Sequence, residues 1–104
     1  MTKYVLIYHN CPEPGDEVDM DKMMEDWRIW VEGMGTNLLD PGTGVGMSKT
    51  VMSDGSVVDN GGSNPITGYC VIGADNMENA LDKTKEHPFL NTGGSIEIAE
   101  SWEH

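Results

Sequence analysis

The sequence predicts a single α+β domain made of two β-α-β units with a β-hairpin inserted between them. The chain has 104 residues, which fits one domain with a single hydrophobic core. Its apolar residues follow a strand-like pattern in some segments and a helical three- and four-residue spacing in others. Segments rich in Gly and Pro separate these stretches and mark the turns.

The first unit begins with an apolar strand and continues into an amphipathic helix. Residues 3–9 are rich in Tyr, Val and Ile and are apolar on both faces of a strand. Residues 11–15 contain two prolines and a glycine and are predicted to be a loop. Residues 18–33 are predicted to be a helix with acidic residues on its outer face. Its inner stripe is Met20, Met23, Met24, Trp27, Trp30, Val31 and Met34.

Glycines end this helix, and a second strand is predicted over residues 36–40. Residues 41–46 form a glycine-rich loop. Residues 48–59 are predicted to be a hairpin, because Asp54-Gly55 tolerates the positive φ angles of a type I′ turn.

The second unit repeats the order strand, helix, strand. Residues 66–73 are predicted to be a strand, and Asp75 is predicted to cap the next helix with Glu78 as its capping-box partner. His87-Pro88 ends that helix. Residues 94–102 form the last strand, in which polar and apolar side chains alternate.

This order is that of a ferredoxin-like βαββαβ fold with an inserted β-hairpin: a four-stranded antiparallel sheet with two helices on one face. Two helices cover only one face of such a sheet, yet the first strand is apolar on both. The uncovered face would expose a few hundred Å² of apolar surface, which soluble monomers rarely tolerate. We therefore expect a homodimer in which a second copy covers this face.

The charge and the cysteine content limit the classes of binding partner and the cellular compartment that we expect. The net charge is −12 and the pI is about 4.3, so the surface repels nucleic acid and anionic membranes. No stretch approaches the ~20 apolar residues that span a bilayer. Cys11 and Cys70 lie far apart with no C-x-x-C motif, and are predicted to be free thiols of a cytoplasmic protein.

With these elements in place, the chain resembles the YCII-related (DGPF-like) family nearly end to end. The resemblance implies that residues 1–104 form one YCII-related domain and that the domain is a dimeric α+β barrel. The matching residues are the strand Lys3-Tyr4-Val5-Leu6-Ile7-Tyr8, the helix tryptophans Trp27 and Trp30, Leu39-Asp40-Pro41-Gly42, Thr67-Gly68-Tyr69-Cys70-Val71-Ile72, Glu86-His87-Pro88-Phe89-Leu90 and Gly94-Ser95-Ile96-Glu97-Ile98.

The chain also departs from the family pattern at two places. Many relatives carry Asp-Gly-Pro-Phe followed by a Lys-Glu pair, whereas this chain has Asp59-Asn60-Gly61-Gly62 and no such pair. Other relatives carry a histidine in the first helix as half of a proposed His-Asp dyad, and this first helix has none. One branch of the family includes a dehydrochlorinase.

His9 and Asp40 are the candidate catalytic residues. Each stands at the end of a predicted strand, and in many sheets of this type those strands are neighbours. Histidine titrates near neutral pH and is a common general acid or base. The pair would support proton transfer or elimination on a small organic molecule. Alternatively, His9 bonds a loop carbonyl and Asp40 stabilises a turn.

Seven further residues are candidate ligand-binding residues: Tyr8, Trp27, Trp30, Ser48, Lys49, Tyr69 and His87. Each has a structural alternative. The two tryptophans would simply fill the core, and Lys49 would be a surface lysine of the hairpin. A cationic His87 would suit the negative end of the second helix.

No cofactor or metal site is predicted. Gly42-x-Gly44-x-Gly46 lacks the dinucleotide-binding spacing, and His9 with Cys11 offers at most two metal ligands. Three functions stay open: a cofactor-independent enzyme, a non-catalytic dimer that binds a metabolite or regulatory partner, and a purely structural dimer. His104 is given no role, because a terminal histidine also begins purification tags.

Overall fold

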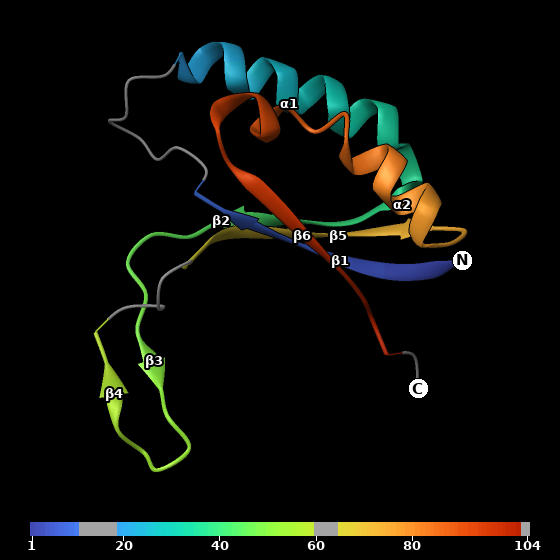
Figure 1. Cartoon of the computed structure of the whole chain (residues 1–104). Coiled ribbons are helices and arrows are strands. Elements are labelled where there is room, and N and C mark those ends of the chain that lie inside the picture. Colours follow the sequence, from blue (N-terminus) through green and yellow to red (C-terminus); the bar gives the residue numbers. More distant parts are fainter. Residues whose placement is uncertain (11–18, 60–64, 103–104) are drawn as a thin grey trace.

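A computed structural model describes residues 1–10, 19–59 and 65–102, apart from the side chains of Met20 and Thr92. Its main sheet is antiparallel and has the strand order β2-β5-β1-β6, which is compatible with a ferredoxin-like fold (Figure 1). The strands are β1 (Thr2–His9), β2 (Leu38–Gly44), β5 (Ile66–Ala74) and β6 (Ser95–Glu100). The predicted loop at residues 11–15 lies outside the described residues.

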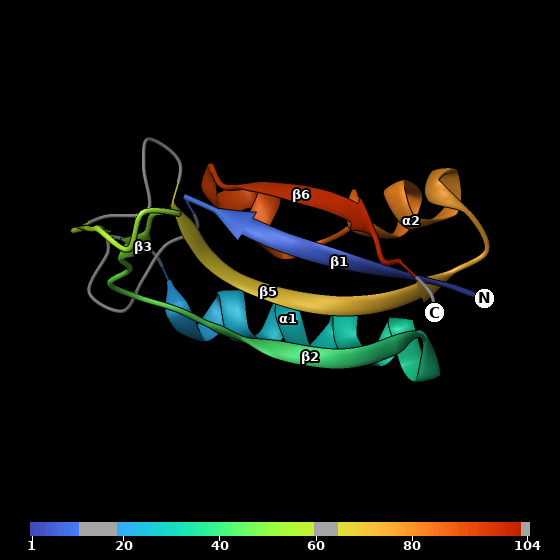
Figure 2. The same cartoon turned by 90° about the horizontal axis from the view of Figure 1, so that it is seen from below.

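Both helices lie on the same face of the sheet. They are α1 (Met20–Met34) and α2 (Met77–Thr84), and Figure 2 shows them behind the sheet when it is viewed from below. Short 3₁₀ turns, η1 (Gly35–Asn37) and η2 (Pro88–Thr92), follow each helix. Within the described residues, neither helix has the length and apolar character needed to cross a membrane. The sheet thus has one covered and one open face.

The hydrophobic core lies between the sheet and the helices. It contains Tyr4, Leu6, Tyr8, Trp30, Met34, Cys70, Ile72, Ala74 and Ala80, with Trp27, Val31, Leu38, Phe89, Ile96 and Ile98 packed against it. The indole N–H of Trp30 donates to the Lys83 carbonyl oxygen at 3.1 Å and so ties α1 to the end of α2. Met24, predicted to face the core, is instead exposed, because it lies at the border of the inner stripe of α1.

The strand β2 extends beyond its predicted end at Asp40, through most of the predicted glycine loop, to Gly44. It lies at the edge of the sheet, where Pro41 does not interrupt the pairing of a central strand. Its register with β5 shifts twice, and Gly42 has φ +66° beside the Tyr69 carbonyl. The turn-forming residues of this segment are accommodated within the strand as β-bulges.

Residues 45–59 leave the sheet on its open side and carry a separate two-stranded ladder, β3 (Thr50–Val51) with β4 (Val57–Val58) (Figure 1). We call residues 45–59 the arm. Its turn is not type I′, because Gly55 alone takes a positive φ, +89°. The Gly55 N–H donates to the Met52 carbonyl, and Asp54 accepts from the backbone and hydroxyl of Ser56. These bonds favour a three-residue turn.

The second helix is capped one residue later than predicted. The Asn76 side chain, not that of Asp75, accepts from the Asn79 N–H at 2.8 Å, and the Asn79 side chain accepts from the Asp75 N–H. Asparagine is as good an N-cap as aspartate, so sequence alone does not choose between adjacent positions. The helix ends at Thr84, and His87 instead caps η2 by accepting from the Phe89 N–H.

Candidate functional site

His9 lies on the open face at the end of β1 and pairs with Glu97 of β6. Its Nε2 lies 3.1 Å from Glu97 Oε1, and its Nδ1 lies 3.3 Å from the Pro65 carbonyl oxygen. Each ring nitrogen thus faces an oxygen, so a proton on either nitrogen has an acceptor. A carboxylate that orients an imidazole is the usual support of a histidine acid or base.

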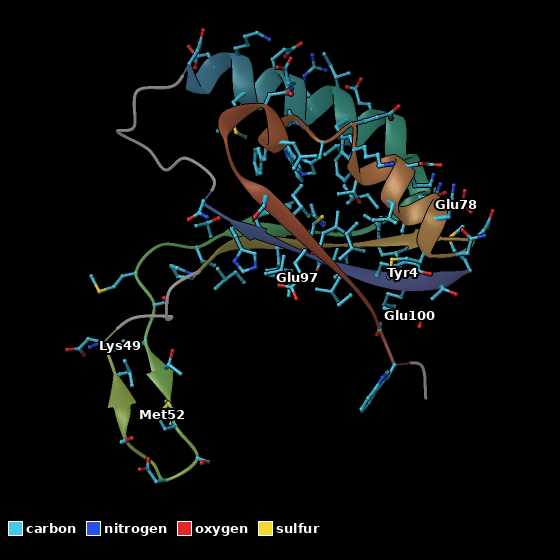
Figure 3. The ribbon with its side chains drawn as sticks, viewed as in Figure 1. Tyr4, Lys49, Met52, Glu78, Glu97 and Glu100 are labelled. Atoms are coloured by element: carbon cyan, nitrogen blue, oxygen red, sulfur yellow. The ribbon has the colours of Figure 1, made fainter. Side chains whose placement is uncertain are left out.

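Strand register explains this pairing. Side chains alternate along β1, so Ile7 and His9 face the same way, and Glu97 of β6 stands directly opposite Ile7. Glu97 and His9 are therefore diagonal neighbours on the open face, within reach of long side chains. Figure 3 shows Glu97 on the side of β6 away from the helices. The imidazole is sheltered, with 11 % of its side chain exposed, whereas the Glu97 side chain is 65 % exposed. The pair thus connects a sheltered nitrogen to solvent.

The structure does not bring Asp40 to His9. The strand β5 lies between β1 and β2, so the expected neighbourhood of the first two strands is wrong. His9 pairs with Ile66 and Asp40 with Val71, positions five residues apart on β5 or about 16 Å. The Asp40 carboxylate accepts from the Gly42 N–H at 2.8 Å. This contact is the one expected if Asp40 stabilises a turn and does not act in catalysis.

Four of the other candidates belong to a buried aromatic cluster on the helix side. Tyr8, Trp27, Trp30 and His87 contact one another and Phe89, with ring centroids 4.5 Å apart for Trp30 and His87 and 5.5 Å apart for the two tryptophans. The two tryptophans stack on each other, Tyr8 meets His87 edge to face, and the planes of Trp30 and His87 are tilted by 46°. Close packing of aromatic rings in these orientations stabilises a core. They fill the space between helix and sheet with one another.

His87 is neutral within this cluster. Its Nδ1 accepts the Phe89 N–H, so the ring proton sits on Nε2 and is donated to the Tyr8 hydroxyl oxygen at 2.9 Å. Burial lowers the pKa of His87 to about 4. The expected cationic histidine at the end of the second helix is therefore wrong. Burial also raises the pKa of Cys70 to about 11, against a hydrogen bond to Tyr8 that lowers it. Cys70 is a free, buried thiol.

The three other candidates lie outside this cluster. Tyr69 is half-buried on the open face, opposite Ile7 on β1 and Thr43 on β2. Lys49 lies at the root of the arm (Figure 3). It forms an ion pair with Asp59 at 3.0 Å. Ser48 beside it is half-buried. The candidates are thus divided between the open face, the arm and the core.

A surface groove of about 550 Å³ runs between α1 and the segment from α2 to η2. Ile29, Trp30, Met34, Lys83, Glu86 and Asn91 are among the residues that line it. Lys22, Arg28, Lys49 and Lys85 each pair with a carboxylate, whereas no carboxylate of the described residues lies within ion-pair distance of Lys83. The lining also includes the carboxylates of Asp26 and Glu86, so acidic residues outnumber the half-buried Lys83 in this groove.

Glu97 was not among the residues singled out from the sequence. Its position among apolar residues of the last strand was a signal, but its partner stands 88 positions earlier in the chain. Only the strand order brings the two together. Within the described residues, no three His, Cys, Asp or Glu side chains gather in a group able to hold a metal ion.

No protein family model matches the chain, and no curated protein matches it.

Proposed function

We propose that the protein is a homodimer whose open sheet faces pack together, and that the His9–Glu97 pair transfers protons to and from a small organic molecule. The observation that carries the proposal is the apolar open face. Val5, Ile7, Tyr69 and Val71 lie at its centre and Leu39 at its edge, and no helix in the described part of the chain covers them (Figure 2). Covering such a face removes apolar surface from water, which favours association.

The placement of charge supports a second copy as the partner. Three acidic residues of α1, Glu25, Asp26 and Glu32, pair with basic residues of the same helix on its exposed surface. The centre of the open face carries aliphatic and aromatic side chains, with the His9–Glu97 pair beside them. Two such faces can meet without bringing the acidic helices together, because the helices remain on the outside.

The proposal includes three further points. The chain belongs to the YCII-related family, its dimer is an α+β barrel with the arm as the inserted hairpin, and the protein is cytoplasmic. The strand order, the shared helix face and the position of the arm support the barrel. In such a dimer His9 and Glu97 would border the space between the two sheets. A sheltered imidazole with a solvent-connected carboxylate suits proton transfer without a cofactor.

The assembly is tested by sedimentation over a dilution series. The wild type should sediment at twice its 11.4 kDa mass, and Val71→Asp should be monomeric because it buries a charge in the interface. The control is Ile29→Asp, an exposed apolar residue on α1, which should leave the dimer intact. A wild type that stays at 11.4 kDa throughout would refute the assembly.

The chemistry is tested by deuterium exchange in D₂O, followed by NMR, with pyruvate, acetoacetate and acetone as probes. The wild type should speed exchange beside the carbonyl of at least one probe. His9→Asn should lose this activity, and Glu97→Gln should reduce it by about 10²-fold, a typical general-base contribution. Glu100→Gln on the same strand is the matched control. Asp40→Asn distinguishes the two carboxylates, since activity lost there and kept in Glu97→Gln would assign the role to Asp40. Exchange by His9→Asn at the wild-type rate would refute the site.

A further inference from the structure

Two strongly exposed apolar features lie at opposite ends of the open face. One is the arm, where Val51 is 71 % and Val57 is 57 % exposed, with Met52 and Val58 also exposed. The other is Trp102, which is 86 % exposed. The arm leaves the sheet between β2 and β5, at the end where His9 lies. The Ser101 N–H bonds the Lys3 carbonyl and so holds Trp102 at the other end.

Both features lie on the side that a second copy would occupy. Figure 1 shows the arm and residues 101–102 after β6 on the side of the sheet away from the helices, at opposite ends of the strands. Figure 3 places Met52 on this side as well. The strands β3 and β4 form a sheet of their own, whose ladder pairs Thr50 with Val58 and Val51 with Val57, and three of these four side chains are exposed valines. A ladder this short is marginal in water without a packing partner.

We propose that the arm of each copy packs against Trp102 of its partner, in a two-fold dimer whose strands run in opposite directions across the interface. This inference rests on the proposed homodimer. A two-fold axis that lies between the sheets and crosses the strands brings the arm end of one copy to the Trp102 end of the other. The contact then occurs twice, as an isologous interface requires.

The size of the interface supports the arm contact. A face of four strands measures only about 20 Å in each direction. The arm and Trp102 enlarge the surface available to the partner at both ends, and a stable interface buries about 800 Å² of accessible surface on each partner. Stacked sheets lie about 10 Å apart, and an arm of this length extends roughly 20 Å, enough to pass alongside the partner's sheet. Tryptophan is also the side chain most enriched at interface hot spots.

A double-mutant cycle tests the contact through the dimer dissociation constant. One variant is Trp102→Ser and the other is Val51→Thr with Val57→Thr, which keeps the β-branched residues that the ladder needs. Each should raise the dissociation constant at least tenfold. All variants combined should weaken the dimer little more than one alone, since they remove the same contact. Ile29→Ser on α1 is the matched control and should leave the constant unchanged. Circular dichroism checks that each variant is folded.

The outcomes separate this inference from the proposed homodimer. A wild type that is monomeric overturns both. A dimer that survives Trp102→Ser and the arm variant unchanged overturns the arm contact alone and leaves the sheet interface standing. Losses that add fully in the combined variant overturn the pairing of arm with Trp102, because the two features then contact different surfaces. Tryptophan emission offers an independent readout: it should shift to shorter wavelength on dimerisation in the wild type and not in Trp102→Ser.

Discussion

His87 is held between a backbone N–H and a phenol oxygen inside a cluster of aromatic rings. The Phe89 N–H fixes one ring nitrogen as an acceptor, and the Tyr8 hydroxyl oxygen accepts the proton from the other. The ring is 1 % exposed and contacts both tryptophans of α1. A proton added at Nδ1 would break the Phe89 bond and place a charge in a site with no carboxylate partner among the described contacts. The site therefore favours the neutral ring.

This preference predicts that the protein loses stability in acid through His87. The pKa is lowered to about 4 in the folded chain, whereas an unfolded histidine titrates near 6.5. Between these values the unfolded chain binds more protons, so His87 contributes stability that is present above pH ~6.5 and lost as the pH falls toward 4. The full loss is on the order of 3 kcal/mol. It is measured as the free energy of unfolding in urea from pH 7 to pH 4.

The variant His87→Gln isolates this contribution from the titrating carboxylates. It should be less stable than the wild type at pH 7, yet the difference between the two should shrink as the pH falls. The control His9→Gln changes a histidine on the open face and should keep the His87 contribution. A wild type and a His87→Gln variant with parallel pH profiles would contradict the assignment.

At the scale of elements, the edge strand β2 depends on one glycine. Gly42 has φ +66°, and a Cβ atom there would lie on the Tyr69 carbonyl oxygen. We expect Gly42→Ala to cost at least about 2 kcal/mol, because it combines an unfavourable backbone conformation with a clash against backbone. Gly46→Ala is the matched control, since a Cβ there meets nothing within 4 Å. Thermal unfolding compares the two, and equal melting temperatures would show that β2 adapts freely.

The spacing of apolar residues predicted the strands and helices of the covered core, because each of these elements buries a row of apolar side chains. It failed where alternative local structures have nearly the same free energy. Asn76 and Asp75 are both good N-caps, and Pro41 is tolerated because β2 happens to lie at an edge. The candidate pair was harder to predict. His9 was a candidate from the sequence, but Glu97 was not, since their contact depends on β6 lying beside β1. Strand order is a property of the whole fold, not of a sequence window.

At the scale of the whole molecule, the net charge of −12 opposes the proposed dimer. The proposed interface is mainly apolar, and the ion pairs of α1 and α2, such as Arg28–Glu25 and Lys85–Asp82, lie on the helix side. Two copies thus repel over a long range and attract only on contact. The repulsion is screened by salt, whereas burial of Val5, Val71 and the arm is not weakened by it.

The dimer should therefore bind more tightly as salt is raised. Between about 10 mM and 0.15 M NaCl the screening length falls from roughly 30 Å to 8 Å, and we expect the dissociation constant, measured by sedimentation, to fall severalfold. The His9–Glu97 pair lies within one chain, so its screening leaves the association unchanged to first order. Ile29→Lys on the helix side changes the net charge from −12 to −11 without touching the interface, and the weaker repulsion should tighten the low-salt dimer. A dimer that dissociates as salt is added would contradict this prediction and would indicate ion pairs across the interface.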